Sequence, residues 1–220
     1  MEIDRVDSSS FIDNYSDRID YTRYRTLELV AGELKKKYGN ELSKYCVAEA
    51  GVNAGSFAEA ISVEFSCCKL YLYDTFTGFD SNDMKFEMDN SYTHTHYLEE
   101  IDSRFKAEGE HFLIKKVLER VKNPDKTIVR KGYFPDTIEE EREEKFVFVS
   151  LDMDIYKPMY EGIIFFYPRL VKGGVIFVHD YNNVEYKGVR KALEDAECQL
   201  GEIPCIPMSD KCGTVILLKL

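Results

Sequence analysis

The sequence predicts an α/β fold with a mostly parallel seven-stranded sheet, helices on both faces and an antiparallel hairpin at the C-terminal edge. Strand-like and helix-like segments alternate from residue 45 to residue 200. Phe146–Asp152 and Val175–His179 are nearly continuous apolar runs, as expected of strands buried on both faces. The chain ends in two short strand-like segments around a polar turn, Ser209–Gly213. Ligands of such sheets bind beyond the carboxyl ends of the strands, so the residues there are candidates for a site.

Each element has a local signal. Residues 1–17 are polar and are expected to form a loose arm, whereas Tyr21–Lys37 has apolar residues at helical spacing and a stop at Gly39. The predicted strands are Tyr45–Glu49, Lys69–Asp74, Thr127–Arg130, Phe146–Asp152, Val175–His179, Ile203–Met208 and Thr214–Leu220. The predicted helices between them are Phe57–Phe65, His96–Val121, Met159–Leu170 and Glu185–Leu200. The charged segment 80–122 is predicted to be an insert that acts as a lid, and Lys172–Gly174 a loop before the fifth strand.

The composition limits the class of protein. A chain of 220 residues fits one domain, 1–220, with a full core. The net charge of −11 disfavours nucleic acid or anionic lipid as a partner, and no apolar run is long enough to predict a membrane span. Six cysteines without C-x-x-C spacing, and no secretory signal, predict reduced thiols in a cytoplasmic protein. We expect the chain to act as a homo-oligomer.

A glycine-rich turn follows the first predicted strand. Glu49 is followed by Gly51, Asn53, Gly55 and Ser56, after which a helix begins. Such a turn brings backbone N–H groups and a helix N-terminus close to a nucleotide-like ligand. The spacing differs from the G-x-G-x-x-G of dinucleotide-binding folds. It matches three of the four places of the first motif of S-adenosylmethionine (SAM) methyltransferases, with Asn53 in place of the central glycine. The alternative is a helix-start turn that binds nothing.

Acidic residues follow three of the predicted strands. Asp74 ends the second strand, where a carboxylate can accept hydrogen bonds from ribose hydroxyls or cap the following turn. Asp152 and Asp154 leave the fourth strand, and His179 and Asp180 end the fifth. If these two strands are neighbours, Asp152, Asp180 and His179 form a site for Mg²⁺, since oxygen ligands completed by water suit this ion. The alternative is helix capping, and His179 could be a ligand, a general base or a hydrogen-bonded wall residue.

Two further segments frame the predicted pocket. Gly132, Tyr133 and Phe134 follow the third strand, and their aromatic rings could contact an adenine or pack under a loop. His94 and His96 lie in the lid segment without a completing zinc ligand set, which favours a solvated loop over a metal site.

Five motifs in order resemble the macrocin O-methyltransferase family, the sugar O-methyltransferases of macrolide biosynthesis and their bacterial relatives. They are Glu49–Ser56, Tyr73–Phe79, Lys131–Thr137, Leu151–Tyr156 and Gly173–Tyr181, and the similarity spans roughly residues 20 to 195. The resemblance implies a class I methyltransferase (Rossmann-like) fold, SAM as methyl donor, and a divalent cation, usually Mg²⁺, that chelates hydroxyls of the acceptor. The family often has two acidic residues before the last tyrosine, and here His179 replaces the first.

The resemblance also implies roles for individual residues. Gly51 and Ser56 would lie by the methionine part of SAM, Asp74 by the ribose, and Asp152 and Asp180 on the metal. The full set expected around the cofactor is Glu49, Gly51, Asn53, Gly55, Ser56, Asp74, Thr75, Phe76, Gly132, Tyr133 and Phe134. The set expected on the metal is Asp152, Asp180 and His179.

The predicted reaction is methyl transfer from SAM to a hydroxyl of a small molecule, a sugar or a glycosylated natural product. Asp152, through the cation, and His179 are the expected catalytic residues, with His94 or His96 as alternative bases. A nicotinamide-dependent dehydrogenase is disfavoured by the glycine spacing and by the lack of a Tyr-x-x-x-Lys pair after the fourth strand. A catalytically silent SAM-binding or scaffold protein is the other alternative, which the replacement at His179 would support.

Overall fold

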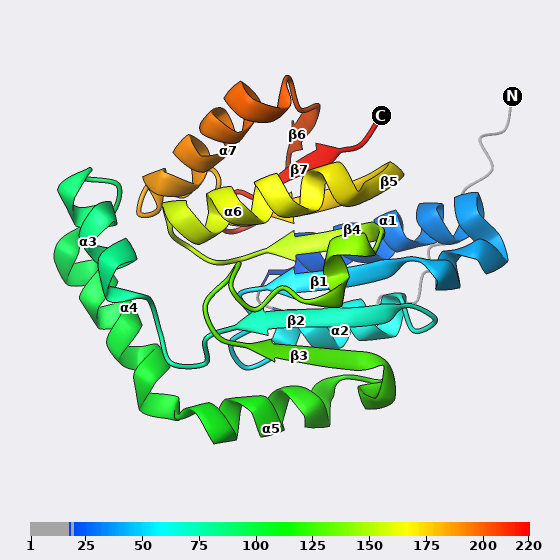
Figure 1. The fold of residues 1–220 in the computed structure, drawn as a ribbon, viewed down its shortest axis with the longest axis horizontal. Coiled ribbons are helices and arrows are strands. Elements are labelled where there is room, and N and C mark those ends of the chain that lie inside the picture. The colour runs from blue at the N-terminus through cyan, green and yellow to red at the C-terminus, as the bar shows by residue number, and fades with distance from the viewer. Residues whose placement is uncertain (1–17, 19) are drawn as a thin grey trace, which may run out of the picture.

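The computed structural model describes residue 18 and residues 20–220, so the predicted arm of residues 1–17 lies outside the described residues. Its sheet has seven strands in the order β3-β2-β1-β4-β5-β7-β6 (Figure 1). The strands are β1 (Cys46–Ala50), β2 (Lys69–Asp74), β3 (Thr127–Lys131), β4 (Phe146–Leu151), β5 (Leu170–Val178), β6 (Cys205–Pro207) and β7 (Val215–Leu218). The first five are parallel, whereas β7 is antiparallel to both β5 and β6. The predicted sheet with its C-terminal hairpin is confirmed.

Helices cover both faces of the sheet. The α-helices are α1 (Tyr21–Tyr38), α2 (Ser56–Glu64), α3 (Ser81–Asp89), α4 (Thr95–Glu108), α5 (Glu110–Arg120), α6 (Tyr156–Phe166) and α7 (Lys187–Leu200). Helices α1, α2 and α5 pack on one face, and α6 and α7 on the other, each over its own apolar cluster. The side chains of β1 alternate between the two clusters, as the pleat of a strand requires. Val47 belongs to the cluster under α1, α2 and α5, and Ala48 to the cluster under α6 and α7.

The insert differs from its prediction. The single helix expected over His96–Val121 is two helices, because Gly109 takes a left-handed φ of 79° between α4 and α5. Helix α3 was not predicted, although the side chain of Asp80 caps its N-terminus by accepting from the N–H groups of Asn82 and Asp83. Helices α3 and α4 stand beyond the carboxyl ends of the parallel strands (Figure 1).

Lys172–Gly174 is not the predicted loop but an irregular part of β5. The register with β4 skips Val147 there, and Gly173 has a φ of 80°. The N–H of Gly173 donates to the carbonyl of Lys219, and the N–H of Lys219 donates to the carbonyl of Gly174, at 2.6 and 3.0 Å. The C-terminal strand therefore supplies the hydrogen bonds that keep this stretch extended.

No helix among the described residues is both long and apolar enough to span a bilayer.

The core is rich in aromatic rings from both the sheet and α6. Phe166 is fully buried and contacts the rings of Phe134, Phe146 and Tyr73, with centroid distances of 5.8, 5.0 and 5.9 Å. This cluster lies under the loop that follows β3 and helps to place it.

We predict that Phe166→Ala lowers the free energy of unfolding by about 3–5 kcal/mol, because it leaves a cavity among three rings. Phe112→Ala is the control, since Phe112 is 57% exposed, and we expect a change within about 0.5 kcal/mol. Urea unfolding followed by circular dichroism measures both. Similar losses in the two variants would contradict the central role of the α6 cluster.

Candidate active site

The turn between β1 and α2 passes very close to the end of β4. Gly51, Asn53 and Gly55 have φ values of 85°, 48° and 77°. A Cβ atom on Gly51 would lie 1.9 Å from the carbonyl oxygen of Asp152, so only glycine fits at this position. The N–H of Gly51 donates to the carbonyl of Tyr73 on β2 at 2.9 Å. The glycine-rich turn is thus fixed against the neighbouring strands on both sides.

Asp74 holds this turn from the end of β2. Its Oδ2 accepts from the backbone N–H groups of Val52 and Asn53 at 2.7 and 2.8 Å, and its Oδ1 accepts from that of Phe76 at 2.6 Å. Burial raises the pKa of Asp74, while these three hydrogen bonds oppose the shift. The bond to Phe76 is the local turn cap that the sequence left as an alternative. Each carboxylate oxygen can accept two hydrogen bonds and Oδ1 accepts only that from Phe76, so Asp74 can still accept from a ligand hydroxyl.

A cavity of about 330 Å³ opens beside the turn. Ten of the eleven residues predicted to surround the cofactor line it: Glu49, Gly51, Asn53, Ser56, Asp74, Thr75, Phe76, Gly132, Tyr133 and Phe134. Gly55 does not line the cavity, because it lies against Val117 of α5. Phe134 also belongs to the core cluster around Phe166, so its ring packs under the loop as well as lining the cavity.

The cavity is acidic. Among the described residues that line it, six carry a carboxylate: Glu49, Asp74, Asp80, Asp83, Asp152 and Asp154. Arg23 is the single basic residue in that lining. Glu49 is 1% exposed, and its Oε2 has no hydrogen-bond partner among the described residues. Burial raises the pKa of Glu49 well above its usual value, so a cationic ligand would stabilise its ionised form.

Three carboxylates meet where β4 and β5 end. Oxygen atoms of Asp152, Asp154 and Asp180 all lie within 4.8 Å of one another. Asp154 and Asp180 have left-handed φ values of 66° and 58°, an unfavourable conformation for these residues that persists where the surrounding structure enforces it. Burial and the charges of Asp180 and Asp152 raise the pKa of Asp154 well above its usual value. The expectation that Asp152 and Asp180 converge is confirmed in its geometry, and Asp154 joins them.

His179 bridges two of these carboxylates. Its Nδ1 lies 2.8 Å from Oδ1 of Asp152 and 2.7 Å from Oδ2 of Asp180. Although burial opposes protonation, the charge of Asp152 holds the pKa of His179 well above its usual value. Burial likewise opposes ionisation of Asp152, but His179 and Arg23 keep the pKa of Asp152 below its usual range. His179 and Asp180 lie behind Asp152 and do not themselves line the cavity.

Arg23 is the residue at this site that the sequence analysis missed. It comes from α1, is 6% exposed, and donates from Nη1 to Oδ2 of Asp152 and from Nη2 to Oγ of Ser150, both at 2.9 Å. Its guanidinium carbon lies 3.9 Å from the centroid of the Phe57 ring. A basic residue beside the apolar stripe of a helix that otherwise faces the core was the available signal.

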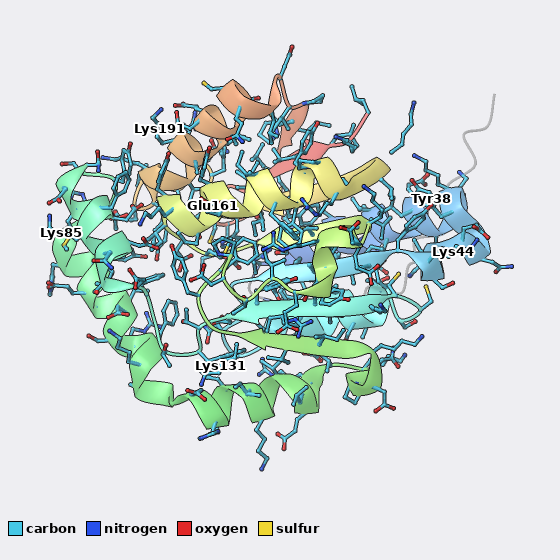
Figure 2. The ribbon with its side chains drawn as sticks, viewed as in Figure 1. Tyr38, Lys44, Lys85, Lys131, Glu161 and Lys191 are labelled. Carbon is cyan, nitrogen blue, oxygen red and sulfur yellow. The ribbon has the colours of Figure 1, made fainter. Side chains whose placement is uncertain are left out.

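The insert covers one side of the cavity. Asp80, Asp83, Phe105 and Leu113 of the insert contribute to the lining. Asp83 accepts from the hydroxyl of Tyr133 at 2.7 Å and pairs with Lys157 of α6 at 2.9 Å. The labelled Lys131, at the end of β3, lies by the start of α5, where its Nζ is 2.6 Å from a carboxylate oxygen of Glu110 (Figure 2).

A second contact docks the insert on the body of the fold. Oε1 of the buried Glu87 in α3 accepts from the N–H of Tyr156, the first residue of α6, at 2.6 Å.

His94 and His96 are exposed and do not line the cavity, so their position does not support the role of alternative base.

The fold and the cavity beside a glycine-rich turn define a class I methyltransferase. A family model, macrocin-O-methyltransferase (TylF), matches residues 56–203. The chain therefore belongs to the macrocin-O-methyltransferase family and is a SAM-dependent O-methyltransferase, as the motifs predicted. This decides against the nicotinamide-dependent dehydrogenase.

Solved structures agree in fold. The O-methyltransferase NovP is 14% identical, with a TM-score of 0.68 over 90% of this chain and 80% of that chain. CalS11, a calicheamicin methyltransferase, is 15% identical, with a TM-score of 0.64 over 97% of this chain and 86% of that chain. An O-methyltransferase from Bacillus cereus in complex with SAH is 12% identical, with a TM-score of 0.54 over 89% and 81%. No curated protein sequence matches significantly.

We predict that Gly51→Ala destabilises the protein, because left-handed strain costs about 1–3 kcal/mol and the new methyl group overlaps the carbonyl of Asp152. Gly32→Ala is the matched control. Gly32 lies within α1 with no atom near its Cβ position, so we expect about 0.5–1 kcal/mol of stabilisation. Urea unfolding compares the two variants, and equal midpoints would contradict the close approach of the turn to β4.

Proposed function

We propose that the chain transfers the methyl group of SAM to a hydroxyl of a sugar or a glycosylated natural product, assisted by a divalent cation such as Mg²⁺. The observation that carries this proposal is the group of three carboxylates at the ends of β4 and β5, next to the cavity by the glycine-rich turn. Two of them, Asp152 and Asp154, line that cavity, so a bound cation would face the acceptor.

The cofactor would lie along the cavity between the turn and the loop after β3. The turn of Gly51 and Ser56 would hold the methionine end, with Glu49, whose Oε2 has no hydrogen-bond partner among the described residues, facing its ammonium group. Asp74 would accept from the ribose hydroxyls while it holds the turn. The segment from Gly132 to Phe134 would face the adenine. The insert of residues 80–122, docked through Asp83 and Glu87, would act as the lid.

The residues at the strand ends fit a hard divalent cation. Carboxylate oxygens are its preferred ligands, and Asp152, Asp154 and Asp180 supply three within 4.8 Å of one another. Burial, together with the charges of Asp180 and Asp152, raises the pKa of Asp154, so a cation bound here would favour its ionised form. The cation would polarise the acceptor hydroxyl and lower its pKa. The chain's own contribution is to hold the hydroxyl oxygen in line with the methyl and sulfur atoms.

His179 would position the carboxylates and not act as a free base. Its Nδ1 is already held between Asp152 and Asp180, at 2.8 and 2.7 Å. One imidazole therefore holds the two carboxylates near each other. The sequence analysis expected His179 as a metal ligand or a general base, and the role proposed here is instead to contact the two other expected ligands. Asp152 remains the proposed catalytic residue, because it also faces the cavity.

A sugar acceptor is supported by the family and by one named relative in structure. The apo structure of CalS11 is that of a TDP-rhamnose 3′-O-methyltransferase, with a TM-score of 0.55 and 14% identity to this chain. Its fold resemblance covers 97% of this chain, including the insert that would form the acceptor side of the cavity. The alternative of a catalytically silent SAM-binding protein rests on His179 alone, and it requires SAH binding without methyl transfer to any hydroxylated acceptor.

We predict that Asp180→Asn abolishes methyl transfer and weakens Mg²⁺ binding by about tenfold or more, because one hard anionic ligand becomes a neutral amide. SAH binding should change by less than about threefold, since Asp180 does not line the cofactor cavity. Asp125→Asn, at an exposed carboxylate near β3, is the control and should alter neither. Calorimetry with Mg²⁺ and with SAH separates the two effects, and full activity in excess EDTA would refute the role of the cation.

We predict that Asp74→Asn weakens SAH binding by about 1–3 kcal/mol, because the amide cannot accept from the three backbone N–H groups and the ribose together. Asp125→Asn again serves as the control. Calorimetric titration with SAH gives the affinities. An unchanged affinity in the Asp74 variant would place the ribose elsewhere in the cavity.

A further inference from the structure

The charge of the cavity raises a question about the carboxylate of the cofactor. The methionine end of SAM carries an ammonium group and a carboxylate on the same carbon atom. Six carboxylates line the cavity among the described residues, and they suit the ammonium and the sulfonium but repel the ligand carboxylate. Arg23 is the only basic side chain in that lining, so the ligand carboxylate has one cationic partner available.

Arg23 has the unused donors that such a contact needs. A guanidinium carries five N–H donors, and Arg23 uses one on Nη1 for Asp152 and one on Nη2 for Ser150. Its Nε is buried and has no hydrogen-bond partner among the described residues. Nε and the adjacent Nη hydrogen lie on one edge of the group, the pattern that binds a carboxylate through two parallel hydrogen bonds. The stacking of Arg23 on Phe57, itself in the lining, fixes the plane of the group.

We propose that Arg23 binds the α-carboxylate of the methionine end of SAM, opposite the contact of Glu49 with the ammonium group. The proposal rests on the proposed cofactor pocket and adds a residue from α1, a helix that precedes the glycine-rich turn. Because Nη1 of Arg23 also holds Asp152, one side chain joins the cofactor to the acidic strand end. Arg23 is thus both a binding residue for the cofactor and a positioning residue for Asp152.

A purely structural role for Arg23 explains less. In that role Arg23 would only neutralise the charge of Asp152, which it contacts at Oδ2. His179 already contacts the other oxygen of Asp152, Oδ1. Such a role leaves the buried Nε of Arg23 without a purpose, although a buried donor without a partner is unfavourable. The two interpretations differ in one measurable respect: in the structural role, the ligand carboxylate does not interact with Arg23.

The test compares SAH with its decarboxylated analogue, which keeps the amine but lacks the carboxylate. We expect wild-type protein to bind SAH about 10- to 100-fold more tightly than the analogue, since a charge-assisted pair is lost. In Arg23→Gln this difference should fall to about threefold or less, mainly through weaker SAH binding. Arg23→Lys should retain part of it, because a point charge remains without the planar fork. Calorimetry of wild-type and Arg23→Gln protein with each ligand gives the four affinities of the cycle, and the same two titrations are made with Arg23→Lys.

Arg18→Gln is the matched control. Arg18 pairs with Glu59 and does not line the cavity, so its removal should leave the ratio of the two affinities unchanged. Equal affinities of wild-type protein for SAH and the analogue would overturn the role of Arg23, whatever the stability of the variants. Equal weakening of both ligands in a folded Arg23→Gln protein would overturn it as well. Failure of wild-type protein to bind either ligand would instead refute the proposed cofactor pocket, and Arg23 with it.

Discussion

The close approach of the β1–α2 turn to the end of β4 is the constraint on which the rest of the site depends. Position 51 has no room for a side chain, because the carbonyl of Asp152 occupies that space. Asp74 draws the same turn toward β2 by accepting from the N–H groups of Val52 and Asn53. The backbone of the turn therefore lies directly against the backbone of Asp152, and this contact places the cavity next to the acidic strand ends. A change that moved this turn away from β4 would therefore alter both the cavity and the position of the acidic strand ends.

Electrostatics explains why so many carboxylates can be buried around one cavity. Each buried carboxylate is unfavourable unless hydrogen bonds or an opposite charge compensate for it. Asp74 uses three backbone N–H groups, and Asp152 uses Arg23 and His179. Oε2 of Glu49 has no hydrogen-bond partner among the described residues, Asp154 lies beside two other carboxylates, and burial raises the pKa of both. The uncompensated charge is therefore concentrated at the two places where a cationic ligand group is proposed to bind.

Much of the fold could be predicted because its signals are local. Parallel strands buried on both faces are continuous apolar runs, and the residues at their carboxyl ends lie at one edge by topology, which is why Asp74, Asp152 and Asp180 were found. The insert could not be predicted well, because α3 depends on contacts such as that of Glu87 with the start of α6, far along the chain. Lys172–Gly174 has the composition of a turn, but pairing with Lys219 keeps it in β5.

Arg23 was missed for a related reason. A sequence shows that an arginine lies beside an apolar helix stripe, but it does not show which strand end the helix covers. In the structure α1 covers the face of the sheet on which Val47 and Phe148 lie, and this brings Arg23 to Ser150 and Asp152 at the end of β4. A site composed of strand ends can thus be predicted from a sequence. A residue that a covering helix contributes can be found only when the packing of that helix on the sheet is known.

His179 lies between the acidic side chains at the ends of β4 and β5, at a position where the family resemblance leads us to expect a carboxylate. A carboxylate at this position would place a fourth negative charge beside Asp152, Asp154 and Asp180, and the mutual repulsion of these side chains would increase. The imidazole instead contacts both Asp152 and Asp180, so it holds these two carboxylates near each other, while backbone hydrogen bonds hold the strands. Arg23 adds a second positive charge from α1. These two cationic side chains therefore favour a preorganised arrangement of the carboxylates.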